Sequence, residues 1–191
     1  TFLGLAAMAD PPREESIKAV QKAKEAGCVI SYDPNYRASL WKSEELAKKQ
    51  MRSMVQYADL MKISEEETML LTGESDYQKA AELLMQSGVK IVVVTLGKTG
   101  AYVQTRQGGQ LVKGFQNKAV DATGAGDAFW GGFLFQFSRC EKAPETITTE
   151  EAAKFADFGN AVASVCVQKH GAIPAMPDMA QTLEQLKEER L

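Results

Sequence analysis

Short apolar runs alternate with segments of helical periodicity through roughly the first half of the chain. Apolar positions recur at the three- and four-residue spacing of a helix over residues 13–26, 43–57 and 76–87. Apolar runs of strand length cover residues 28–32, 60–63 and 90–96. Strands that alternate with helices of this size predict an α/β fold with a mainly parallel sheet and helices on both of its faces.

The second half of the chain has a different pattern. Two strand-like segments flank Gln-Gly-Gly at residues 107–109 and predict a β-hairpin formed by residues 101–106 and 110–115. Helical periodicity then covers residues 124–138 and 149–169, and a last amphipathic helix is expected after Pro177 and Asp178. No repeat, low-complexity tract or linker interrupts the sequence, so residues 1–191 are expected to belong to a single domain.

Composition and charge narrow the function classes. The chain has 191 residues, a formal net charge of -3 and no segment in which Lys and Arg concentrate. A nucleic-acid surface needs a basic patch, so this class of partner is not expected. No apolar stretch approaches the roughly 18 residues of a membrane span, so no membrane insertion is expected either.

Cysteine usage and the first residues add two further expectations. Three cysteines, far apart and without a CxxC pair, indicate neither a disulfide framework nor a zinc site, and favour a reducing cytoplasm: Cys28, Cys140 and Cys166. The sequence opens on Thr1 without a secretory pattern and reads as the middle of a domain, so further residues are expected upstream.

The most specific feature is the stretch Val-Asp-Ala-Thr-Gly-Ala-Gly-Asp-Ala-Phe at residues 120–129. Two glycines separated by alanine open a strongly apolar helix. Amides at a helix N-terminus have no intrahelical partner and carry partial positive charge, and glycine lets a phosphate approach them closely. Asp127 belongs to the same first turn, where the helix dipole favours its negative charge. Amides beside a carboxylate suit phosphoryl transfer to a hydroxyl, although a tight turn with a dipole-complementing Asp is the structural alternative.

This stretch closely resembles the C-terminal signature of the ribokinase-like (PfkB) sugar kinases, DTxGAGD. The resemblance implies that Asp127 is the catalytic base and that Gly124, Ala125 and Gly126 form the anion hole. Ala122 departs from the usual Thr of the signature, whereas Thr123 is kept. The implied fold is the Rossmann-like, three-layer α/β/α ribokinase fold with its hairpin on the C-terminal side. The N-terminal strands and lid of that fold are expected to be absent here.

Thr-Leu-Gly-Lys-Thr-Gly at residues 95–100 contains the Gly-Lys-Thr of a phosphate-binding P-loop, but the full P-loop motif fails. That motif needs a glycine five positions before Gly97, where Val92 stands inside a predicted strand. The segment is similar to the TLGxxG segment of the same kinase family, and the resemblance implies that Thr95, Gly97 and Gly100 line the nucleotide. A plain strand-to-hairpin turn is the alternative.

Asp-Pro-Asn-Tyr-Arg at residues 33–37 follows a predicted strand, at the edge where α/β sheets bind ligands. A generic turn with an exposed Arg would explain this segment alone. With Leu40 and Trp41 it is similar to the DPNxR…LW stretch of fructokinases and 2-keto-3-deoxygluconate kinases. The resemblance implies that Asn35 and Arg37 face the sugar.

Ser64-x-x-Glu67 is a helix capping box, a purely structural device. The family has an Asn-x-x-Glu motif at this place, so the resemblance implies that Glu67 holds Mg²⁺ through water and that Ser64 lies by the nucleotide. By the same resemblance, Asn160 faces the nucleotide, with an exposed helix Asn as the alternative. Asp121 and Thr123 match positions that hold an alkali cation, K⁺, in some members.

The function expected from this resemblance is ATP- and Mg²⁺-dependent phosphorylation of a sugar hydroxyl, with fructose favoured. Small molecules, the sugar and ATP, are the expected ligands, and the parent protein is a candidate homodimer. Two alternatives stay open: 2-keto-3-deoxygluconate kinase or another sugar kinase of this family, and a nucleotide-binding fragment without kinase activity.

Overall fold

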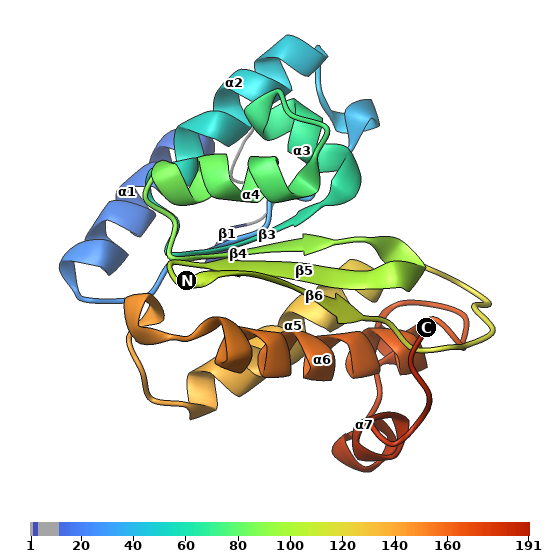
Figure 1. Cartoon of the computed structure of the whole chain (residues 1–191). Helices are drawn as coiled ribbons and strands as arrows, with labels where there is room; N and C mark the ends of the chain where they lie inside the picture. The colour runs from blue at the N-terminus through green and yellow to red at the C-terminus, as the bar shows by residue number, and fades with distance from the viewer. Residues whose placement is uncertain (1, 4–11) are drawn as a thin grey trace. The chain divides into compact units, whose positions relative to one another are not determined.

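A computed structural model describes the backbone of residues 2–3 and 12–191 and the side chains from residue 14 onward. The chain divides into two compact units (Figure 1). The first contains residues up to 94 together with 104–106, and the second contains residues 95–103 and 107–191.

The first unit is a parallel α/β assembly. Its strands lie side by side in chain order: β1 (Phe2–Leu3), β2 (Ser31–Tyr32), β3 (Leu60–Ser64) and β4 (Ile91–Thr95). The register is parallel between β1 and β2 and between β2 and β3. The chain crosses between strands through α1 (Pro12–Glu25), a 3₁₀ turn (Ala38–Leu40), α2 (Glu44–Val55), α3 (Glu65–Thr72) and α4 (Tyr77–Gln86). The alternating pattern of the sequence is therefore confirmed for this unit.

Helix starts in the first unit follow local chemistry. Ser43, Ser64 and Asp76 each accept a backbone N–H of the helix that they precede. This bond satisfies one of the donors that a helix N-terminus leaves open. Apolar side chains from α2 and the strands, among them Met51, Met54 and the whole of Ile91–Val94, are fully buried.

The strand expected at residues 28–32 is shorter than predicted. Regular pairing begins only at Ser31, because the Asp59 carboxylate accepts the N–H of Ile30 at 2.8 Å in place of a ladder partner. Cys28, at the start of this apolar run, is exposed.

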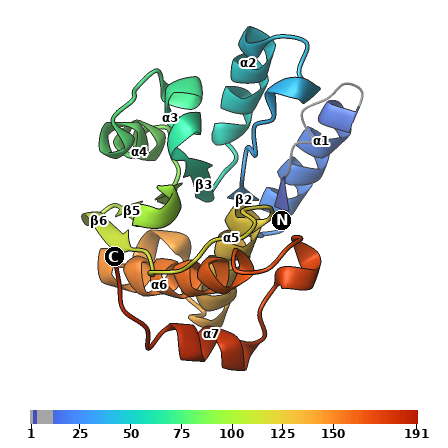
Figure 2. The same cartoon turned by 90° about the vertical axis from the view of Figure 1, so that its right-hand side faces the viewer.

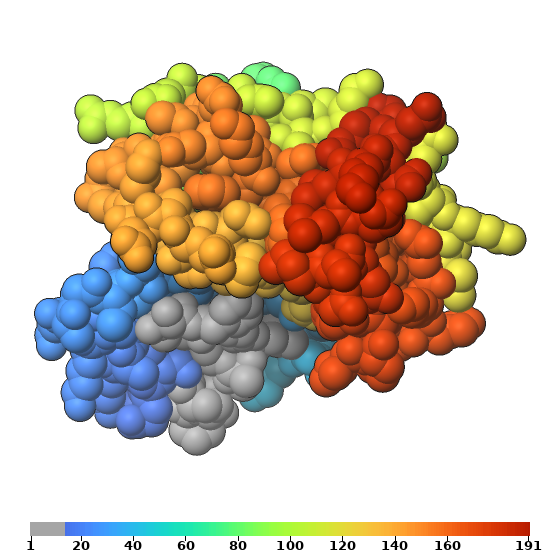
Figure 3. Space-filling view, turned by 90° about the horizontal axis from the view of Figure 1, so that it is seen from below, coloured from blue at the N-terminus to red at the C-terminus, as the bar shows by residue number. Residues whose placement is uncertain are grey.

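The second unit contains three α-helices and most of a hairpin, of which residues 104–106 group with the first unit. Strands β5 (Gly100–Thr105) and β6 (Gly108–Lys113) are joined by two residues, Arg106 and Gln107, which places the turn one residue earlier than predicted. The helices are α5 (Ala125–Arg139), α6 (Thr149–Cys166) and α7 (Met179–Gln185). Helix α7 packs against α6, and Figures 2 and 3 show it with the C-terminal tail covering part of the α6 surface.

Aromatic packing joins α5 to α6. Trp130 and Phe133 stack with their ring centroids 4.9 Å apart, and Phe133 meets Phe155 of α6 edge-on at 5.7 Å. Phe129, Trp130 and Phe133 are buried in the core, whereas Phe135 is 38% exposed and lies over Phe158.

None of the helices in the described part of the chain is long and apolar enough to cross a membrane.

Candidate active site

A cavity of about 270 Å³ lies within the second unit. Four segments surround it: the turn after β4, the segment after β6, the start of α5 and one face of α6. The residues that line the cavity are Thr95, Gly97, Lys98, Gly100, Gly114, Phe115, Asn117, Ala119, Ala122, Ala125, Gly126, Phe129, Asn160, Ala163, Ser164 and Val167. Six residues predicted from the resemblance are among them, namely Thr95, Gly97, Gly100, Ala125, Gly126 and Asn160.

The start of α5 opens toward this cavity. Gly124 occupies the cap position in the left-handed conformation, with φ 79°, and offers no side chain to cap the helix. Ala125 donates its N–H to the Ala122 carbonyl at 3.1 Å, so this amide is already used within the turn. The first-turn amides that a ligand can reach are therefore those that follow it, at Gly126 and Asp127.

Asp127 is exposed in this first turn. The side chains that follow it, Ala128 and Phe129, are buried in the core. The helix thus presents its carboxylate to solvent, beside the residues that line the cavity. A phosphate at this helix end would meet backbone donors next to a carboxylate, an arrangement suited to moving a proton during phosphoryl transfer.

Asp121 fixes the segment that leads into α5. One of its carboxylate oxygens accepts the N–H of Thr123 at 2.9 Å, and the other accepts the N–H of Gly171 at 2.9 Å. Hydrogen bonds from Thr123 and Gly171 lower the pKa of Asp121 to about 2. Asp121 therefore carries its charge at neutral pH and connects the α5 entry to the segment after α6, a structural role that sequence analysis did not foresee.

Two glycines bring the turn after β4 against the end of β6. A Cβ on Gly100 would lie 2.1 Å from the Val112 carbonyl oxygen, and a Cβ on Gly114 would lie 2.3 Å from the Lys98 carbonyl oxygen. Gly114 also donates its N–H to the Thr99 carbonyl at 2.9 Å. Backbone therefore packs directly on backbone here.

Asn160 has a structural role beside its place in the cavity. Its Nδ2 donates to the carbonyls of Val112 and Lys113, each at 3.3 Å, and its side chain is buried. The alternative of an exposed helix Asn is therefore excluded. One turn further along α6, Ser164 accepts a hydrogen bond from Asn117 at 2.8 Å. The first contact holds the end of β6 against α6, and the second holds the segment that follows β6.

The DPNYR segment belongs to the first unit, and buried charge holds it. The Asp33 carboxylate accepts the N–H of Asn35 at 3.1 Å and the Nζ of Lys62 at 2.8 Å. Asn35 has a positive φ of 49°. Arg37 is exposed, and its guanidinium donates to the Tyr36 carbonyl at 2.9 Å. Arg37 therefore lies at the surface, on a turn that the buried Asp33 carboxylate holds in place.

Glu67 holds the same segment from α3. One carboxylate oxygen accepts the N–H of Tyr36 at 2.6 Å and the other accepts the N–H of Ser64 at 2.8 Å. Ser64 completes the predicted capping box by accepting the Glu67 N–H. The structural role of this motif is thus confirmed, while its roles toward Mg²⁺ and the nucleotide stay predictions. Within the described residues, no group of three His, Cys, Asp or Glu side chains could hold a metal ion by itself.

The predicted site residues therefore form two groups, one in each unit. Among the lining residues that sequence reasoning missed are Gly114, Phe115, Asn117 and Ser164. Gly114, near the end of the predicted hairpin, was the one available signal. The pairing of Asn117 with Ser164 spans 47 residues and left no local trace.

The sequence profile of the pfkB family carbohydrate kinases matches residues 1–179. The chain belongs to this family. Among curated relatives, probable fructokinase-4 of Arabidopsis thaliana is 38% identical over 182 residues, a match that covers 93% of this chain and 54% of that protein. Fructokinase-2 of Solanum lycopersicum is 39% identical over 181 residues, with the same coverage. The chain thus spans about half the length of the curated relatives it matches.

Solved structures of this family share the fold. The fructokinase of Vibrio cholerae O395, in a form with fructose, ADP and calcium ion bound, is 30% identical with a TM-score of 0.89. The match covers 97% of this chain and 60% of that one. The aminoimidazole riboside kinase of Salmonella enterica, complexed with aminoimidazole riboside and an ATP analog, is 28% identical with a TM-score of 0.85, covering 98% and 62%. The ribokinase-like α/β fold predicted from the sequence is confirmed.

Proposed function

We propose that this protein acts in the ATP-dependent phosphorylation of a sugar hydroxyl, with Asp127 as the base. The observation that carries the proposal is the exposed Asp127 carboxylate in the first turn of α5, beside a cavity that the same turn helps to line. The cavity provides space for the nucleotide, and the helix N-terminus provides backbone donors for its phosphates.

The reaction follows from these positions. The acceptor hydroxyl gives its proton to the Asp127 carboxylate as its oxygen attacks the γ-phosphorus of ATP. The bond between that phosphorus and the bridging oxygen breaks, and ADP leaves with the electron pair. The amides of Gly126 and Asp127 stabilise the charge on the transferring group. A positioned base of this kind accelerates the step by about 10²–10⁴.

Mg²⁺ would neutralise charge on the phosphate oxygens when bound with ATP. Each Glu67 oxygen keeps a lone pair after accepting its backbone N–H, and Mg²⁺ in proteins usually retains several waters. These donors therefore fit a contact through water. Asp121 and Thr123 are the proposed neighbours of an alkali cation, to which the ionised Asp121 would supply negative charge.

Fructose is the favoured acceptor. The curated relatives at about 38% identity are fructokinases, and a structural neighbour binds fructose. We assign Asn35 and Arg37 to sugar recognition, since the DPNYR segment is held in one conformation by Asp33 and Glu67. The cytoplasm is the proposed location.

The test combines binding with turnover. Isothermal titration calorimetry of the full chain with MgATP should give saturable binding, and a coupled assay should release ADP with fructose in preference to ribose and 2-keto-3-deoxygluconate. Absence of ATP binding would refute the proposal. ATP binding without transfer to any of the three sugars would instead identify a nucleotide-binding fragment, and preference for the acidic sugar would identify a 2-keto-3-deoxygluconate kinase.

A further inference from the structure

The C-terminal tail pairs with the wall of the cavity. Arg190 forms an antiparallel bridge with Phe115, and flanking hydrogen bonds run from Gln116 N–H to the Glu189 carbonyl at 3.4 Å and from Leu191 N–H to the Gly114 carbonyl at 3.0 Å. Gly114 and Phe115 both line the cavity. The tail therefore acts as a short extra strand behind the segment that a nucleotide would touch.

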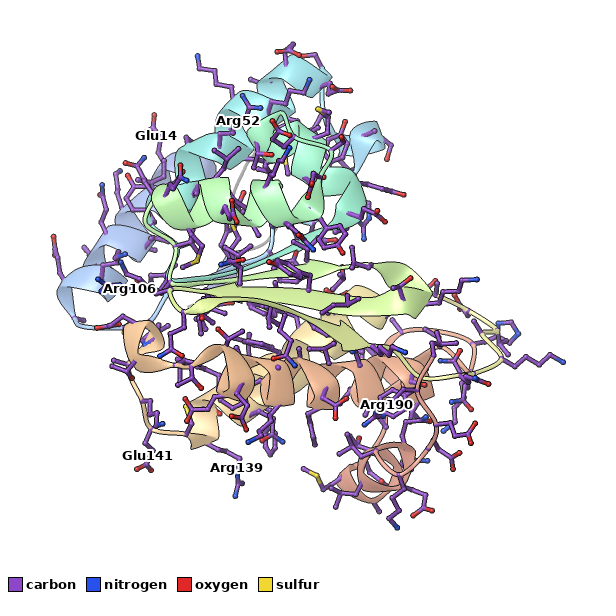
Figure 4. All side chains as sticks on the ribbon, viewed as in Figure 1. Glu14, Arg52, Arg106, Arg139, Glu141 and Arg190 are labelled. Atoms are coloured by element: carbon purple, nitrogen blue, oxygen red, sulfur yellow. The ribbon has the colours of Figure 1, made fainter. Side chains whose placement is uncertain are left out.

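The Arg190 side chain adds contacts to this backbone pairing, on one side to the Phe115 ring and on the other to α6. Its guanidinium carbon lies 3.7 Å from the centre of the Phe115 ring, well inside the range of a cation–π contact. Its Nη2 donates to the Asp157 carboxylate of α6 at 3.0 Å and to the Leu186 carbonyl at 3.4 Å. Figure 4 shows Arg190 where the tail runs along α6. One side chain thus connects the cavity wall to α6.

These contacts continue a series along one face of α6. Asp157, Asn160 and Ser164 are spaced three and four residues apart, so they lie on the same side of the helix. Each of them holds part of the segment 112–117. Asp157 acts through Arg190, which contacts Phe115, whereas Asn160 binds the Val112 carbonyl directly and Ser164 binds Asn117. The other edge of this segment packs against the Lys98–Gly100 turn, where no side chain could intervene. A displacement of residues 112–117 would therefore move the main chain that lines the cavity.

We infer that Arg190 is a positioning residue for the nucleotide pocket, acting through Phe115 and Gly114. Arg190 lies beyond residues 1–179, the part of the chain that the family profile matches. The inference rests on the proposed function, since it takes the cavity to be the ATP site. It requires that loss of the guanidinium loosens the wall and weakens ATP binding, without contact between Arg190 and ATP.

The test compares two substitutions that each remove one ion pair to α6. Arg190→Met keeps an apolar stem but loses the charge and the planar group. Lys142→Met removes the Lys142–Glu151 pair, which involves no residue of the cavity, and serves as the matched control. We expect the Kd for MgATP, measured by calorimetry, to rise about fivefold or more for Arg190→Met. The Kd should stay within about twofold for Lys142→Met, because neither Lys142 nor Glu151 lines the cavity and distant sites are usually independent.

Thermal melts of both variants separate positioning from general stability. If both lose ATP affinity in proportion to their loss of stability, the role of Arg190 is merely structural and the inference is wrong. Unchanged affinity in a folded Arg190→Met also overturns it. If the wild-type chain does not bind ATP, the proposed function itself fails, which is a distinct result.

A second measurement needs no variant. In wild-type protein, hydrogen exchange of the Gln116 and Leu191 amides reports the bridge between tail and wall. We expect saturating MgATP to slow their exchange several-fold, because ATP binding favours the ordered wall. Unaltered exchange at both amides, in protein that binds ATP, would contradict the inference.

Discussion

The Nζ of Lys62 lies 2.8 Å from Oδ2 of Asp33, and the two side chains are only 7% and 3% exposed. Asp33 also accepts the Asn35 N–H, so this ion pair lies directly beneath the DPNYR turn. Removing one partner of so deeply buried an ion pair strongly destabilises the fold, because the other partner is left as a buried, unpaired charge.

We therefore expect Lys62→Met to lower the free energy of unfolding by about 3–5 kcal/mol. The double variant with Asp33→Asn should lose less than the sum of the two single variants, since it leaves no buried charge. Urea unfolding of all four proteins in a double-mutant cycle measures this difference. Strict additivity would show that the two side chains do not interact energetically.

Asp127→Asn tests the proposed base. The amide is similar in size but cannot take the proton of the acceptor hydroxyl, so turnover should fall by about 10²–10⁴. ATP affinity should stay within about threefold, because the backbone donors are retained. Initial rates and calorimetric titrations check both values. Turnover at the wild-type level would remove Asp127 from this role.

Gly124→Ala tests the helix start that faces the cavity. The left-handed φ of 79° costs a residue with a Cβ about 1–2 kcal/mol. The new Cβ would also lie 2.7 Å from that of Ala172. We expect both lower stability and weaker ATP binding.

Gly131→Ala in the same helix is the control for this experiment. A Cβ at Gly131 would meet nothing within 4 Å, so the substitution should raise stability by up to about 1 kcal/mol through helix propensity and leave ATP binding unchanged. Equal effects of the two substitutions would mean that the geometry of Gly124 has no special importance. Thermal melts and calorimetric titrations of both variants provide the comparison.

The lowered pKa of Asp121 gives a pH dependence with a definite sign. A carboxyl whose pKa falls from 3.8 to about 2 on folding stabilises the fold above about pH 4, and this contribution is lost as the pH falls toward 2. Asp121→Asn should therefore be less stable than wild type at pH 6, and the difference should shrink between pH 4 and 2. Urea midpoints at pH 6, 4 and 2.5 measure it, and a constant difference would exclude this linkage.

Local signals in the sequence predicted much of the fold. Caps such as Ser43 and Asp76 act within three residues, so they can be read from sequence spacing, and the helices that follow them were placed to within about two residues. The glycine-rich start of α5 is equally local. For this reason the sequence alone predicts both the helix N-terminus and the place of Asp127 in its first turn.

Contacts between distant segments could not be predicted in this way. Glu67 was recognised as part of a capping box, but its bond to the Tyr36 N–H joins segments 31 residues apart. Asp59 shortens β2 by replacing a ladder partner from 29 residues away. The pairing of Arg190 with Phe115 depends on how α6 and α7 return the chain to β6. Neither hydrophobic periodicity nor a local motif predicts where the chain returns in this way.

The close approach of Gly100 and Gly114 has a consequence for redesigning the proposed nucleotide pocket. Lys98 and Thr99 are exposed, whereas Gly100 is buried against main chain. In a library randomised at residues 99, 100 and 114, functional clones should vary at 99, which does not line the cavity, and keep glycine at 100 and 114. Redesign of the pocket is therefore confined to the positions that already carry side chains, since Gly100 and Gly114 leave no room for new atoms.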